Sequence, residues 1–87
     1  MHEFSLMADL MRKIESVARE QGAVRVAGVK VRLGAFSHIS SEHFREHFTA
    51  AAHGTVADGA ELVVETGTDA ADPRGQEVWL ESLTFAE

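Results

Sequence analysis

One apolar stripe constrains the fold more than any other feature of this sequence. Between Ser5 and Gln21 the apolar side chains recur at helical spacing, and charged or polar side chains fill the other positions. This period predicts an amphipathic helix, and Gly22 directly after it is typical of a helix end. The stripe is buried against another layer of the domain, so its methionines are expected in the core. It consists of Leu6, Met7, Leu10, Met11, Ile14, Val17 and Ala18.

A second, shorter helix is predicted over residues 42–52, after a loop that covers residues 34–41. Ser40 or Ser41 can cap its first turn, because a serine hydroxyl accepts a hydrogen bond from a free backbone N–H there. Gly54 is expected to end this helix. Its inner stripe consists of Phe44, Phe48 and Ala51.

Three segments alternate as strands do, at residues 23–33, 61–65 and 76–85. In the first, Gly28 interrupts the alternation and indicates a bulge. In the last, the phase slips near Ser82. The order helix, strand, helix, strand, strand predicts an α+β fold, a small mixed three-stranded sheet with two helices packed on one face.

Length, composition and net charge exclude several classes of site and partner. With 87 residues the chain is expected to form a single domain, 1–87. It has no cysteine, which excludes disulfides, thiolate metal sites and cysteine nucleophiles and favours the cytoplasm. A net charge of −6 would repel a nucleic-acid backbone. No apolar run approaches the roughly 18 residues that a membrane span needs, so neither nucleic acid nor a membrane is expected as a partner.

The first three residues offer a ready-made chelate. The Met1 amine and the His2 backbone nitrogen close a five-membered ring on a metal ion, and the His2 backbone nitrogen and Nδ1 close a six-membered ring. The Glu3 amide or carboxylate can complete the plane. Tetragonal nitrogen and oxygen sites of this kind suit Ni(II) or Cu(II) better than Zn(II).

A second histidine pattern lies on the predicted second helix. His43, Glu46 and His47 form H-x-x-E-H, the inverted zinc-peptidase pattern in which two histidines bind zinc and the glutamate is the general base. Both imidazoles lie on one helix face, which leaves three alternatives: a solvated face, weak metal binding by the pair, or, remotely, a metallopeptidase. His38 and His53 have no partner at ligand spacing.

Several phrases, in order along the chain, carry a family resemblance. They are Met1-His2-Glu3, Ser5-Leu6, Ile14-Glu15, Gly22-Ala23-x-Arg25-Val26, Val31-x-Leu33-Gly34, Phe36-Ser37-x-Ile39, Gly54-Thr55-Val56-Ala57-Asp58-Gly59-Ala60-Glu61-Leu62 and Glu77-Val78-Trp79-Leu80-Glu81-Ser82-Leu83. Together they resemble the HypA family of nickel metallochaperones, which help to insert nickel into nickel–iron hydrogenases. The resemblance is strongest in the phrase from Gly54 to Leu62.

The resemblance implies a nickel site formed by Met1 through its amine, His2 and Glu3, with Ni(II) as transient cargo. Removal of Met1 is disfavoured before a residue as large as His2, so the amine is expected to persist. Family members insert a zinc-binding domain, built on two C-x-x-C pairs, between their last two strands. Here the short connection 67–75 stands in its place, and no zinc is expected. Selectivity between nickel and copper stays open.

The hypothesis is therefore a cytoplasmic, non-enzymatic nickel-binding accessory protein for hydrogenase maturation. Its expected partners are hydrogenase maturation proteins or the hydrogenase large subunit. The alternative is a HypA-like paralogue that has lost metal delivery and acts as a protein-interaction or assembly subunit, through Trp79 or a bare strand edge. The oligomeric state stays open, a homodimer included.

Overall fold

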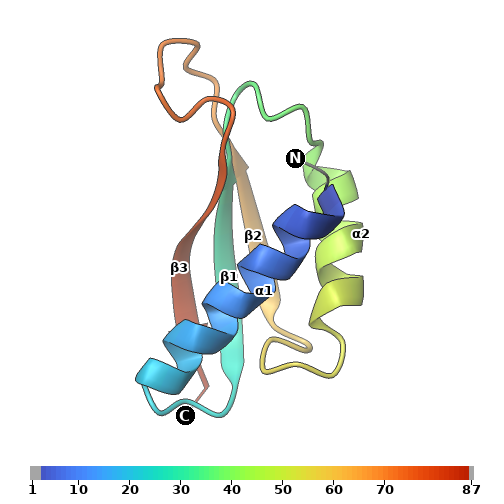
Figure 1. Cartoon of the computed structure of the whole chain (residues 1–87), viewed down its shortest axis with the longest axis vertical. Helices are drawn as coiled ribbons and strands as arrows, with labels where there is room; N and C mark the ends of the chain where they lie inside the picture. Colours follow the sequence, from blue (N-terminus) through green and yellow to red (C-terminus); the bar gives the residue numbers. More distant parts are fainter. Residues whose placement is uncertain (1–2, 87) are drawn as a thin grey trace.

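The computed structural model describes the backbone of residues 3–86 and the side chains of residues 5–86. Its five elements form a three-stranded sheet in the order β2-β1-β3, with β1 parallel to β2 and antiparallel to β3. Both helices lie on one face of this sheet (Figure 1). The predicted α+β fold is confirmed. The elements are α1 (Glu3–Glu20), β1 (Val26–Leu33), α2 (Ser41–Ala52), β2 (Glu61–Thr66) and β3 (Val78–Phe85).

The apolar stripe of α1 is buried, as predicted. The helix begins at Glu3, earlier than the sequence pattern indicated, and Gly22 with φ +67° reverses the chain after it. The Ala23 N–H donates to the Ala18 carbonyl at 2.8 Å, which satisfies one of the free carbonyls at the helix end. The buried residues of α1 are Met7, Leu10, Met11, Ile14 and Ala18, so both predicted core methionines are confirmed.

The central strand β1 has one buried and one polar face. Val29, Val31 and Leu33 point into the core. On the other face, Lys30 and Arg32 lie 3.5 and 3.3 Å from the same carboxylate oxygen of Glu65. The helices therefore cover an apolar face of the sheet, and the opposite face carries a small charge network.

The strand boundaries and irregularities follow from the pairing. β1 begins at Val26 and not at Ala23, because Ala23 still bonds to the end of α1, and Val24 is 90% exposed. The register between β1 and β3 shifts between Val26 and Gly28, which confirms the predicted bulge. A second shift brings Lys30 opposite Ser82 and Val31 opposite Leu80. Glu81 is thus skipped, which explains the phase slip in the sequence of the last strand.

The second helix is held at its start by a cap and along its length by phenylalanines. The Ser40 hydroxyl accepts a hydrogen bond from the His43 N–H at 3.1 Å, which makes Ser40 the cap and places Ser41 inside the helix. Phe44 and Phe48 are buried and stack with ring centroids 6.2 Å apart. These contacts hold the outer face of α2 in a defined orientation.

One end of the molecule gathers several segments that are distant in the sequence. The first turns of both helices, the loop after β1 and the connection between β2 and β3 all lie toward the upper end in Figure 1. Within the described chain, neither helix has the length and apolarity that a membrane crossing requires.

Candidate metal centre

Of the three residues predicted to bind nickel, Glu3 is the first residue of α1. Met1 and His2 lie outside the described residues, and Glu3 is described by its backbone as the first residue of α1. The first four N–H groups of a helix have no acceptor inside the helix. The backbone nitrogen of Glu3 is therefore not required by the hydrogen-bond ladder of α1.

A groove adjoins this first turn. It has a volume of about 460 Å³, and it is lined by Leu6 of α1, by the loop residues Ser37, His38 and Ile39, and by Gln76, Glu77 and Val78 before and within β3. His38 appeared isolated in the sequence. The fold brings it to the same groove as Leu6 in the first turn of α1, a proximity that sequence spacing did not indicate.

His38 also has an unusual backbone. Its φ is +60°, and it is the one non-glycine residue with positive φ within the described chain. This left-handed region is uncommon for residues other than glycine, although His, Asn and Asp enter it more often than most. Residues held in such conformations cluster at functional sites, because the surrounding structure must hold them there.

The histidine pair of α2 lies beside α1. The ring centroids of His43 and His47 are 5.0 Å apart, with a tilt of 56° between the rings. His43 is exposed and His47 is half-buried. His47 also lines a groove of about 510 Å³ between the helices, together with Met7, Met11 and other residues of both helices.

The peptidase alternative gains no support from this arrangement. A zinc peptidase needs a further protein ligand besides its two histidines. Among the residues that the structure describes, no group of three histidine, aspartate, glutamate or cysteine side chains is arranged to hold a metal ion. His43 and His47 form a two-donor arrangement there, and Glu46 has no third ligand to act with.

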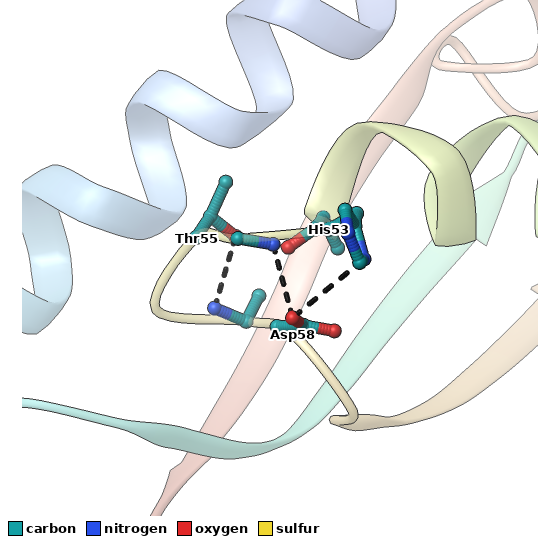
Figure 2. A network of polar contacts seen from close by, with 6 residues as sticks. His53, Thr55 and Asp58 are labelled. Carbon is teal, nitrogen blue, oxygen red and sulfur yellow. Dashed lines mark hydrogen bonds and ion pairs between the residues drawn. The ribbon is translucent and has the colours of Figure 1, made fainter.

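The segment with the strongest resemblance closes α2 and is structural. The Asp58 carboxylate accepts the Gly54 N–H at 3.0 Å and lies 3.8 Å from His53 Nδ1 (Figure 2). The Thr55 hydroxyl donates to the Ala52 carbonyl at 2.7 Å and accepts the Ala57 N–H at 3.1 Å. These bonds turn the chain from α2 toward β2, so this phrase supports the platform and does not supply a metal ligand.

The connection before β3 is fastened by aromatic and ionic contacts. The Arg74 guanidinium carbon lies 3.7 Å from the ring centroid of Trp79, a distance at which cation–π attraction is favourable. The Arg74 Nε lies 3.5 Å from a carboxylate oxygen of Glu77. The Arg74 side chain of this connection therefore packs on Trp79 of β3.

Comparison with known proteins identifies the family to which the chain belongs. A family model described as "Hydrogenase/urease nickel incorporation, metallochaperone, hypA" matches residues 1–72, most of the chain, including the tripeptide at its start. The chain belongs to the HypA family. The resemblance noted in the sequence is thereby confirmed.

Curated HypA relatives match over much of this chain. "Hydrogenase maturation factor HypA" of Chlorobaculum tepidum is 37% identical over 65 residues, which cover 75% of this chain and 58% of the relative. The protein of the same description from Rhizobium leguminosarum bv. viciae is 39% identical over 64 residues, 74% of this chain and 57% of the relative. The matched part thus spans a little over half the length of these HypA proteins.

Solved HypA structures share the fold. The solution structure of the nickel metallochaperone HypA from Helicobacter pylori superposes with a TM-score of 0.81 at 21% identity, and it covers 98% of this chain and 97% of that one. A second HypA solution structure gives a TM-score of 0.76, also at 21% identity. At this identity the likeness establishes the α+β architecture.

Proposed function

We propose that this chain is a nickel-carrying domain for hydrogenase maturation and that it holds Ni(II) through Met1, His2 and Glu3. The observation that carries the proposal is the match to a nickel-incorporation family over residues 1–72, which includes this tripeptide. The curated relatives are described as hydrogenase maturation factors, and we extend that role to this chain.

The chemistry of the tripeptide supports nickel as cargo. The Met1 amine, the His2 amide nitrogen and the His2 imidazole form two fused chelate rings, and Glu3 completes a plane of the kind that Ni(II) and Cu(II) favour. Because α1 begins at Glu3, a metal ion bound to the Glu3 amide would not break a hydrogen bond inside the helix. A site at the chain start also lets a partner's ligands approach the ion.

Several further properties belong to the same proposal. The chain acts as one HypA-like domain, 1–87, in which the connection 67–75 stands where relatives carry their zinc domain. It carries Ni(II) without a resident zinc ion and without catalysis of its own, in the cytoplasm. Its partners are hydrogenase maturation proteins or the hydrogenase large subunit.

Calorimetric titration of the untagged chain with Ni(II) tests the terminal site. We expect one site that His2→Ala weakens by at least about tenfold, because the chelate rings are then broken. Acetylation of the Met1 amine should weaken binding as well, since the blocked nitrogen can no longer close the five-membered ring. His53→Ala is the matched control, because this histidine pairs with Asp58 at the far end of α2.

The outcome against the proposal is equally specific. If His2→Ala and the amine-acetylated chain both bind Ni(II) as the unmodified chain does, the terminal chelate is wrong. The chain would then keep the HypA fold without this metal site, and the protein-interaction alternative would stand. Binding of a maturation partner that ignores both chelator and His2→Ala would point the same way.

A further inference from the structure

We propose that His43 and His47 form a second, exchangeable site for a divalent transition metal ion on α2, where His43 is exposed and His47 lines the groove beside α1. This site goes beyond the proposed terminal chelate and does not depend on it, because its donors come from another helix. It concerns the H-x-x-E-H pattern, in which the structure shows a pair of imidazoles and, among the described residues, no third metal ligand.

The separation of the rings suits joint ligation. With metal–nitrogen bonds of about 2.0–2.1 Å, two imidazoles that share one ion have ring centroids about 4.5 Å apart at a 90° angle and about 5.2 Å apart at a tetrahedral angle. The centroids of His43 and His47 are 5.0 Å apart, between these values. Rotation about the side-chain bonds, without movement of the backbone, is then enough to aim one nitrogen of each ring at a common ion.

The helix that carries the pair is held in place by its other faces. Phe44 and Phe48 are 1% and 2% exposed, so α2 cannot turn without removing both rings from the core. The Ser40 cap bonds to the backbone N–H of His43 itself, and the Arg45 guanidinium donates to the Leu62 carbonyl of β2 at 2.8 Å. The spacing of the two imidazoles is therefore preorganised, which lowers the cost of binding an ion.

The surroundings leave room for an ion and its remaining ligands. His43 is exposed, and His47 lines the open groove of about 510 Å³ between α1 and α2, whose wall includes the carboxylate residue Glu15. Two protein donors leave at least two coordination positions for water or for an incoming ligand. Imidazole donors select Cu(II), Ni(II) and Zn(II) over Mg(II) and Ca(II), which prefer oxygen.

The test uses the full chain with His2→Ala, which weakens the terminal chelate. Ni(II) is the probe. We expect His43→Gln and His47→Gln each to weaken the remaining Ni(II) site by about tenfold or more, since the second imidazole no longer acts at a high effective concentration. The ring proton signals of both histidines should broaden first in an NMR titration. Mg(II) at the same concentration should leave them unchanged.

A position swap supplies a composition-matched variant. The double variant Glu42→His with His43→Glu keeps net charge and an acidic residue in the first turn of α2, but it moves one imidazole off the face of His47. Both positions are exposed, so the fold is retained even where His47→Gln proves destabilising. We expect the swap to remove the Ni(II)-induced rise in melting temperature that site-specific binding produces.

Two results would overturn the site. One is a Ni(II) affinity in the swap and in His43→Gln within twofold of the His2→Ala parent. The other is an equal loss of affinity in His38→Gln or His53→Gln, which would show unselective uptake by any imidazole. A loss of Ni(II) affinity caused by His2→Ala tests only the terminal chelate. The site at His43 and His47 is tested by His43→Gln, His47→Gln and the position swap.

Discussion

Gly34 lies against the backbone carbonyls of Arg74 and Gly75, where the connection between β2 and β3 returns to the end of β1. A Cβ on Gly34 would lie 2.5 Å from the Arg74 carbonyl oxygen. The Gly34 N–H also donates to the Glu77 carbonyl at 2.8 Å. This close approach joins two loops at the end of the molecule where α1 begins.

Gly34→Ala should therefore destabilise the protein by about 2–3 kcal/mol, because a methyl group there forces backbone atoms apart. Gly22→Ala is the matched control. It meets no atom within 4 Å and bears only the left-handed φ of +67°, so we expect a loss of about 1 kcal/mol. Urea unfolding of the two variants measures the difference, and equal losses would contradict the packing argument.

The hydroxyl of Thr55 should contribute more to stability than the exposed hydroxyl of Thr49. Thr55→Val keeps the shape but removes the hydroxyl that bonds to both Ala52 and Ala57 (Figure 2), and we expect a loss of about 1–2 kcal/mol. Thr49→Val removes a hydroxyl on the exposed side of α2, which donates to the Arg45 carbonyl. Because this hydroxyl is exposed, its loss should stay below about 0.5 kcal/mol. A thermal melt that ranks Thr49→Val as the more damaging change would show this interpretation to be wrong.

The positive φ of His38 predicts that glycine at this position gives a more stable protein than valine does. Because φ is +60°, His38→Gly should raise stability or leave it unchanged, within about 1 kcal/mol. His38→Val should lower it by about 1–2 kcal/mol, since a β-branched residue enters the left-handed region at a high cost. Chemical denaturation of both variants checks the order. A valine variant as stable as the glycine variant would mean that the loop relaxes to negative φ.

Nickel binding at the proposed terminal site should weaken as the pH falls. An α-amino group has a reference pKa of about 8 and an imidazole one of about 6.5, so protons increasingly compete with the metal ion on acidification. We expect the Ni(II) dissociation constant to rise on acidification through roughly pH 7 to 6, first because of the amine and then also because of the imidazole. In the chain with an acetylated Met1 amine the dependence should be shallower, since one protonating ligand is removed. A pH-independent constant would contradict amine and imidazole ligation.

Local patterns predicted most of the secondary structure. The stripe from Leu6 to Ala18 indicated α1, since helical spacing depends only on neighbours in the sequence. The bulge at Gly28 and the phase slip near Ser82 were also visible, because each breaks a period of two. The cap of α2 was narrowed to Ser40 or Ser41, and only the observed bond to the His43 N–H selects Ser40.

For the candidate site, too, one part could be predicted from the sequence and another part required the structure. Met1, His2 and Glu3 are neighbours in the sequence, so their chelate could be proposed without a fold, and it stays a prediction because Met1 and His2 lie outside the described residues. The i,i+4 spacing of His43 and His47 follows from helix geometry alone. The position of His47 in the groove between α1 and α2 does not, since it requires Phe44 and Phe48 on the neighbouring face of α2 to be buried in the core.

The sequence by itself predicted the helices, the strands and the family, and it suggested the tripeptide chelate, because spacings and short motifs can be read directly from the chain. The tertiary structure alone decided that β1 lies between β2 and β3, and that His38 reaches the groove beside Leu6. It also decided that Gly34 meets Arg74 and Gly75. These relationships depend on backbone pairing and packing between distant segments, which no local period encodes.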